Sequence, residues 1–509
     1  MAPAYIDRRS AQSFEAVAAA SHSPAERRAL AVQQARLPQR LGGADVGNAV
    51  ATASPDYIAS RLKCWPRMAE RSPIFASVDP LTHNDPWFRE VRDGYESLRT
   101  RHRAVAAAYE QYRSELRHYC DGETTRQRFR PADLPSLQSI PPLGSIIGDT
   151  SDKQPPQQRK LASIVHHEGW LAVWRAATEA DVVHEAAGDT DREHREASRV
   201  IGTSQPFASG WMVMRPVDPG ARIKSAEFVW SLQRRFGLHL SQPAALFEQL
   251  RVDTGVVYDP LGDIITGEKA TDKSLPHDAA LRVLHSATQA SATHTVVLGD
   301  KENPETTAIY NDGCVVDLAE GLTGHGGHDL CLEFKAWNDL VSRGSAAETT
   351  NGGQTHAFGN TEERAIHMNL GVKGQGVEGE ACVWDPTSGT GRVKPHRGAY
   401  HDAIHVKRNQ LVLFLVSLFG GLAPGAVAHM YTLKARAAAQ DTTPYTRLGA
   451  RDYLQYWTQR LSAAIVTANA RRCHRRLKSL QALANRAAAR RTAARHAART
   501  LAALAAERS

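Results

Sequence analysis

The hydrophobic and polar positions of this chain follow two periods. Between Trp87 and Tyr119 the apolar residues recur three, four or seven positions apart, which predicts an amphipathic helix packed against other helices. Residues 276–289 (PHDAALRVLHSATQ) predict a second helix that starts near Pro276. Three short runs after it, 293–299, 314–319 and 329–336, are rich in β-branched residues or alternate strictly, and so predict strands.

Other segments have weaker patterns. Residues 211–214 predict a strand, followed by a Pro-Asp-Pro-Gly turn and a helix capped by Ser225 that ends at Gly237. We expect this helix to turn Phe228, Leu232 and Phe236 inward. A helix is predicted from His401 through the apolar run 411–422, a last strand at 426–435, and a closing helix within 443–480. Together these elements predict an α+β or α/β fold, in which helices flank a mixed core sheet.

Composition shifts predict six segments. They are a weakly helical leader (1–36), a helical domain (37–130), a linker with Pro and Ser (131–158), a small α+β domain (159–275), a domain at 276–437 with a Gly- and Thr-rich insertion at 338–398, and C-terminal helices with a basic tail (438–509).

Cysteine and apolar content narrow the class of protein. Six cysteines without a CxxC pair argue against a disulfide scaffold or a zinc ribbon and favour a reducing compartment. The longest apolar run, 411–422, is too short to span a membrane. We therefore expect an intracellular, nuclear protein without a membrane partner, whose oligomeric state the pattern leaves open.

The positive charge lies at the C-terminus. Residues 471–509 hold ten Arg and one Lys against Glu507 alone, an excess that is larger than the net charge of +8 for all 509 residues. Such a helix binds phosphates through many charge contacts, so DNA or RNA is the expected partner. The alternative is a solvated Ala/Arg helix without a ligand. The predicted nucleic-acid-binding residues are Arg471, Arg472, Arg475, Arg476, Lys478, Arg486, Arg490 and Arg491.

The predicted strands also place chemical groups together. Alternation puts Glu333 and Lys335 on one face, and a neighbouring strand would bring Asp317 beside Glu333. Two carboxylates and the Phe334 carbonyl form an oxygen site suited to Mg²⁺, and Lys335 would position water or phosphate. The alternative is an edge strand with a solvated charged face. An Asp, a turn and then Glu-x-Lys resembles the PD-(D/E)xK nuclease pattern.

Two further stretches resemble one family. Residues 37–62 (LPQRLGGADVGNAVATASPDYIASRL) and 207–240 (FASGWMVMRPVDPG…RRFGLHL) are similar, in order and spacing, to the region after the polymerase core in eukaryotic non-LTR retroelement reverse-transcriptase frames. Residues 259–263 (DPLGD) and His277 match the next segment. The family's zinc ligands are missing, since Arg251, Asp253 and Ile264 stand near their places.

This resemblance implies a restriction-endonuclease-like core sheet and metal-dependent phosphodiester cleavage. It makes Asp317, Glu333 and Lys335 catalytic, with His277 and Gln410 as auxiliary residues, and it implies Mg²⁺. Zinc is not expected, because the family's zinc ligands are missing from this chain. No YxDD-type motif is present, so DNA synthesis is not expected. The competing hypothesis is a decayed or repurposed binding protein without catalysis. His401 and His405, one helical turn apart, are better explained as solvated histidines than as zinc ligands.

Overall fold

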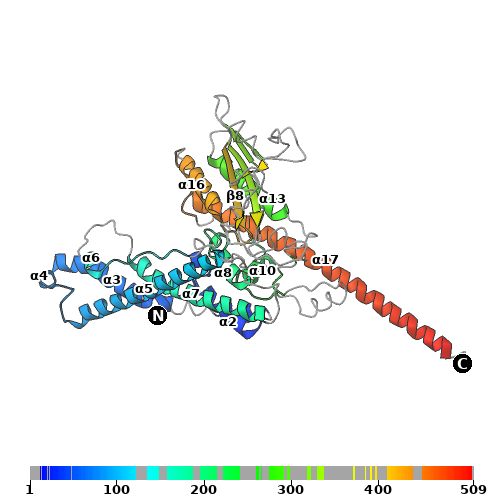
Figure 1. Ribbon diagram of the computed structural model, residues 1–509, viewed down its shortest axis with the longest axis horizontal. Helices are drawn as coiled ribbons and strands as arrows, with labels where there is room; N and C mark the ends of the chain where they lie inside the picture. The colour runs from blue at the N-terminus through cyan, green and yellow to red at the C-terminus, as the bar shows by residue number, and fades with distance from the viewer. Residues whose placement is uncertain are drawn as a thin grey trace.

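A computed structural model describes most of the helical parts of the chain. The described residues are 12–46 (without 13, 20 and 22), 49–121, 135–147, 157–186, 195–214, 222–240, 260–262, 265, 274–291, 295–298, 318–321, 330–337, four two-residue strands between 371 and 397, 410–439 and 450–506. These residues are mostly helical (Figure 1). The expected fold class, a restriction-endonuclease-like mixed core sheet flanked by helices, is therefore wrong, because helix-on-helix packing dominates the protein.

The N-terminal half is built from long helices that pack on one another. Interhelical contacts join α3 to α7, α3 to α5 and α5 to α7. The amphipathic helix expected from Trp87 to Tyr119 is confirmed as part of α5, which buries Tyr95 and Tyr109 completely. The helices are α3 (Ala49–Arg71), α4 (Pro73–Ala76), α5 (Pro86–Asp121), α6 (Leu143–Ile147) and α7 (Gln157–Ala186).

Shorter helices connect this half to the rest. The predicted strand at 211–214 is wrong, because Gly210–Val213 is a helical turn packed on the C-terminal helix. The helix expected after it is present and ends before Gly237, whose φ is +64°, but Phe228 is 38% exposed and does not face inward as Leu232 and Phe236 do. These elements are α2 (Ala25–Ala35), η1 (Gln39–Leu41), α8 (Arg195–Thr203), α9 (Gly210–Val213) and α10 (Ser225–Arg235).

Helix α13 (Ser274–Ser291) lies where the sequence predicts it and contacts two strands of a small sheet. The strand order is β1-β2-β3-β8, with β3 antiparallel to β2 and parallel to β8. Figure 1 shows this sheet beside the start of the long C-terminal helix. The strands are β1 (Thr295–Leu298), β2 (Leu318–Gly321), β3 (Leu330–Trp337) and β8 (Gln410–Ser417), besides the pairs β4 (Gly371–Val372) with β7 (His396–Arg397) and β5 (Trp384–Asp385) with β6 (Thr390–Gly391).

Two predictions of secondary structure near the C-terminus are wrong, because the predicted helix is a strand and the predicted strand is a helix. The apolar run expected to be helical forms β8, and the expected last strand at 426–435 lies in α16 (Pro424–Ala439). A parallel strand buried on both faces is a continuous apolar run, which periodicity cannot distinguish from a buried helix. The α16 sequence begins with Pro and has six Ala among its 16 residues, and Ala is the strongest helix former.

The last element, α17 (Tyr453–Ala506), is a helix of 54 residues. It packs on α13, α9, α10 and α16. It contributes Trp457, Leu461 and Ile465 to the hydrophobic core. Farther along, Leu477, Leu480 and Ala484 pack with Trp230. After Ala484 the helix projects away from the body (Figure 1), and residues 489–502 are exposed without exception.

His429 on α16 gives the fold a pH dependence. Burial, followed by the nearby charge of Arg436, lowers the pKa of His429 from 6.5 to about 4. The unfolded chain therefore binds a proton between pH 6.5 and 4 that the folded chain excludes, and stability falls as pH drops through this window. We expect the free energy of unfolding of His429→Leu, measured with urea, to exceed that of the wild type by up to about 2 kcal/mol at pH 5, and this advantage to shrink at pH 7.5. An advantage independent of pH would contradict the assignment.

Candidate nucleic-acid interface

The predicted carboxylate site lies only partly within the described residues. Asp317 is outside them, and for Glu333 and Lys335 the structure describes the backbone but not the side chains. Leu318 of β2 pairs with Leu332 of β3, one position before Glu333, and Glu333 itself pairs with Leu413 of β8. The metal and catalytic roles of these three residues therefore remain predictions.

The Phe334 carbonyl, predicted to be a metal ligand, contacts the predicted auxiliary residue His277. Nε2 of His277 on α13 lies 3.1 Å from the Phe334 carbonyl oxygen, within hydrogen-bonding distance. The two rings also meet edge to face at 5.2 Å, and Nδ1 of His277 lies 3.0 Å from Asp278. The structure thus brings His277 and Phe334 together, in a contact that joins α13 to β3.

The other predicted auxiliary residue, Gln410, begins a strand. It is the first residue of β8 and pairs in register with Leu330, so its predicted place on a helix is wrong. Its side chain lies outside the described atoms, as do His401 and His405. Among the side chains that are described, no group of three or more His, Cys, Asp or Glu residues is arranged to hold a metal ion.

The predicted phosphate-binding residues divide into two groups along α17. Two of them make contacts within the folded protein. The Arg471 guanidinium forms a 2.7 Å ion pair with Glu227 of α10. Arg472 is 5% exposed and donates a hydrogen bond to Asn469. An arginine in either position is held by a partner within the protein. Arg472 is thus buried, and its predicted contact with nucleic acid stays a prediction.

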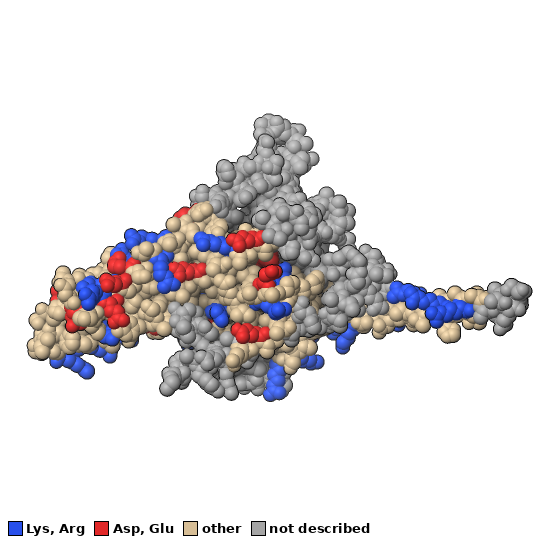
Figure 2. All heavy atoms as spheres, turned by 90° about the horizontal axis from the view of Figure 1, so that it is seen from below, with Lys and Arg blue, Asp and Glu red and all other residues tan. Residues whose placement is uncertain are grey.

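The remaining residues lie on or near the surface. Arg475 and Lys478 are exposed and Arg476 is half-buried, while Arg486, Arg490 and Arg491 are exposed on the projecting half of α17. Figure 2 shows Lys and Arg atoms along this projection without acidic atoms among them, whereas acidic and basic atoms mix on the body. The sequence has no acidic residue between positions 485 and 502, so the charge of this stretch is of one sign.

Two more arginines, Arg495 and Arg499, belong to the same surface and were missing from the predicted set. Both are exposed. With Arg491 they follow one another at steps of four residues, which places them in one row along the helix. Arg486 and Arg490 form a second row about 160° around the axis, from the 100° turn per residue of an α-helix. The Ala-Ala-Arg repetition of the sequence is the signal that identifies them.

Helix α17 is slender where it projects. Alanine fills most positions between the arginines, so the backbone cylinder is covered mainly by methyl groups. An α-helix with its side chains is about 10–12 Å wide, and the major groove of B-DNA is about 12 Å wide. An Ala-rich helix with basic rows on two sides therefore fits between the two phosphate backbones that border such a groove.

Comparisons with known proteins do not assign the chain to a family. No protein-family model matches the sequence, and no curated protein matches it.

In the described residues, no helix is both long enough and apolar enough to cross a membrane.

Proposed function

We propose that this protein binds nucleic acid, and that the projecting half of α17 is its contact with duplex DNA. The observation that carries the proposal is an exposed helical segment with five arginines and no acid between positions 485 and 502. Charge of one sign on a fully exposed segment contributes little to folding, so its energetic role is toward an anionic ligand. Arginine rows on two sides suit phosphates of both strands.

The mode of binding is electrostatic and insensitive to base sequence. Alanine and arginine carry no amide or carboxylate group with which to distinguish one base pair from another. The one base that arginine can recognise is guanine. A-form RNA has a deep and narrow major groove that excludes a helix, which favours DNA as the duplex ligand. The resemblance to retroelement frames, carried by residues 37–62 and 207–240, is an independent argument for the same partner.

Metal-dependent phosphodiester cleavage is the second candidate function. Its support is the antiparallel pairing of β2 with β3, in which Leu318 lies opposite Leu332. The predicted pair, Asp317 and Glu333, is the next position along this register. The test incubates the protein and the variants Glu333→Ala and Lys335→Ala with supercoiled plasmid and Mg²⁺. Nicking by the wild type alone supports catalysis, and equal nicking by all three proteins contradicts it.

The binding proposal is tested by removing four charges from the projection. In the variant Arg486→Gln, Arg490→Gln, Arg495→Gln and Arg499→Gln, glutamine keeps the helix propensity close to that of arginine. We expect affinity for a 30-base-pair DNA to fall at least about tenfold at low salt. The slope of log K against log [salt] should become shallower by roughly 0.9 for each phosphate that the variant no longer neutralises. Fluorescence anisotropy across a salt series measures both quantities.

The matched control removes the same charge from the body. Arg67, Arg71, Arg89 and Arg103 are exposed on α3 and α5, and their replacement by Gln lowers the net charge equally. We expect this control to keep most of the affinity and the salt slope. Equal losses in the two variants would show that only net charge matters, and would contradict a binding role for α17.

A further inference from the structure

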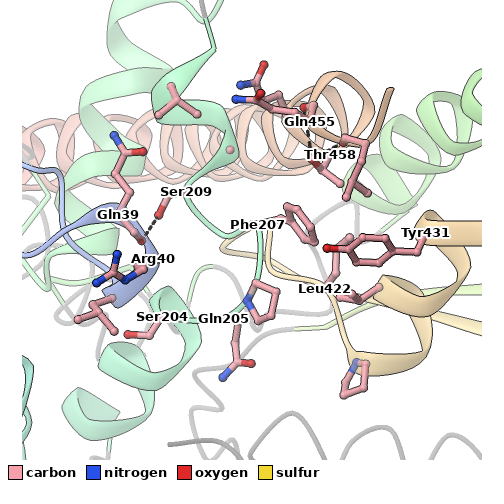
Figure 3. A pocket seen from close by; sticks show the side chains of 18 of the residues that line it. Gln39, Arg40, Ser204, Gln205, Phe207, Ser209, Leu422, Tyr431, Gln455 and Thr458 are labelled. Carbon is pink, nitrogen blue, oxygen red and sulfur yellow. Dashed lines mark hydrogen bonds between the residues drawn. The ribbon is translucent and has the colours of Figure 1, made fainter. Parts of the chain in front are cut away.

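A cavity of about 1200 Å³ lies away from the projecting helix, between the N-terminal and C-terminal halves of the chain (Figure 3). Its walls come from η1, from the segment Ser204–Gly210, and from the first turns of α16 and α17. Small-molecule sites usually occupy about 300–1000 Å³. This cavity is therefore large enough for a nucleotide and part of its neighbours.

Two aromatic side chains project into the cavity. Figure 3 shows Phe207 on the loop and Tyr431 reaching toward it from α16, with Leu422 below them. Tyr431 is 52% exposed, which is high for a ring of its size. Phe207 is partly buried against the hydrophobic core. The exposed ring of Tyr431 is a platform on which an unpaired base can stack.

Phe207 is held in a strained conformation by buried groups. Its φ is +66°, in the left-handed region that bulky residues rarely adopt. Arg235, 1% exposed, clamps the loop on either side by donating to the carbonyl oxygens of Thr203 and Ala208, each at 3.0 Å. Such strain persists where the surroundings impose it, and it is concentrated at ligand sites. Here it keeps the Phe207 ring directed into the cavity.

A buried carboxamide also lines the cavity. Gln459 of α17 is 1% exposed, and neither its Nε2 nor its Oε1 has a hydrogen-bond partner among the described residues. An amide buried in this way costs its full desolvation free energy unless a ligand satisfies it. A carboxamide offers one donor and one acceptor side by side, which matches the donor and acceptor edge of a nucleobase.

The charge of the lining also suits a nucleotide. Arg40 and Arg451 are basic, and the acidic lining residue Asp452 already forms a 2.7 Å ion pair with Lys434. The remaining charge on the lining is positive. An extended peptide would satisfy the carboxamide equally well, but stacking rings together with arginines favour a base linked to phosphate.

We infer that this cavity binds an unpaired nucleotide of a single-stranded nucleic acid, with the base at Phe207, Tyr431 and Gln459 and phosphates near Arg40 and Arg451. The inference depends on the proposed function for its choice of ligand, but it uses a different surface. Duplex binding through α17 and single-strand binding through the cavity are therefore separable by experiment.

The test uses the full chain, a fluorescein-labelled 12-nucleotide single-stranded DNA of mixed sequence, and the duplex of the same sequence. Removing one stacking ring with Tyr431→Ala should weaken single-strand binding about 5- to 100-fold and leave duplex binding unchanged. Tyr431→Phe, the matched control, should keep wild-type affinity. Unchanged single-strand affinity in Tyr431→Ala, or equal weakening toward both ligands, would overturn the inference.

A second variant separates binding from stability. Gln459→Leu has a similar volume and removes the unsatisfied amide, so we expect a higher Tm for the free protein together with weaker single-strand binding. A lower Tm, or retained affinity, would overturn the role assigned to Gln459. If single-strand binding depends on these residues while the wild type ignores duplex DNA, the α17 proposal fails and the cavity proposal stands.

Discussion

Replacing Glu196 with Gln is expected to lower the free energy of unfolding by about 3–5 kcal/mol, because it leaves buried guanidinium groups without their anion. Glu196 is 4% exposed and pairs with both Arg27 and Arg199. Arg199, 2% exposed, also donates to Gln34 at 2.5 Å and to the Arg235 carbonyl at 2.7 Å. The cluster thus ties α2, α8 and α10 together.

The same cluster predicts an acid-sensitive stability. Burial raises the pKa of Glu196, but the attraction of Arg27 and Arg199 outweighs burial and lowers it from 4.5 to about 2. A carboxylate whose folded pKa is depressed contributes stability that is complete above pH 4.5 and is lost as the pH falls through 2. Urea unfolding of the wild type and Glu196→Gln should therefore differ most at pH 6, and the difference should narrow at pH 3.

An exposed pair provides the control. Glu96 and Arg99 lie 2.9 Å apart on α5 with their side chains 50% and 31% exposed, so solvent screens their attraction. We expect Glu96→Gln to change stability by less than about 1 kcal/mol. A loss as small as this in Glu196→Gln would show that the buried cluster does not hold the three helices together.

Replacing Gly43 with Ala is the second change with a large expected effect. A Cβ at Gly43 would lie 1.8 Å from the Leu37 carbonyl oxygen and 2.4 Å from its carbonyl carbon, so the clash is with backbone. That oxygen accepts the Asp45 N–H at 2.9 Å, and the Leu37 side chain is buried, so the turn has no free direction in which to move. We expect a loss of about 3 kcal/mol or more, of the kind that overpacking and strain produce.

Gly144→Ala tests the specificity of this effect. Gly144 lies in α6, and the nearest atom to its added Cβ would be Leu81 Cδ1 at 3.5 Å, an ordinary contact. Alanine favours helix over glycine, so this variant should match or exceed wild-type stability by up to about 1 kcal/mol. Thermal unfolding of both variants, followed by circular dichroism, measures the contrast. A Gly43→Ala protein as stable as Gly144→Ala would contradict the packing argument.

The candidate site shows where prediction from sequence ends. The basic character of residues 471–509 was evident from composition, but composition could not separate Arg472, which is buried against Asn469, from Arg486, which is exposed. Burial depends on which segment packs beside the helix, and here that segment is α10, more than 200 residues earlier. Similarly, nothing local marks Gln459 as unpaired or Phe207 as strained.

The sequence by itself determined the elements whose pattern is local and long. The apolar spacing of α5, the helix expected near Pro276 and the closing helix expected within 443–480 were readable because a helix satisfies its backbone within one segment. Tertiary structure alone decided that residues 410–417 form a strand, since their backbone partner is β3, about 80 residues earlier. It also assembled Glu196 with Arg27 and opened a cavity between distant helices. These features depend on contacts between remote segments, which no local period encodes.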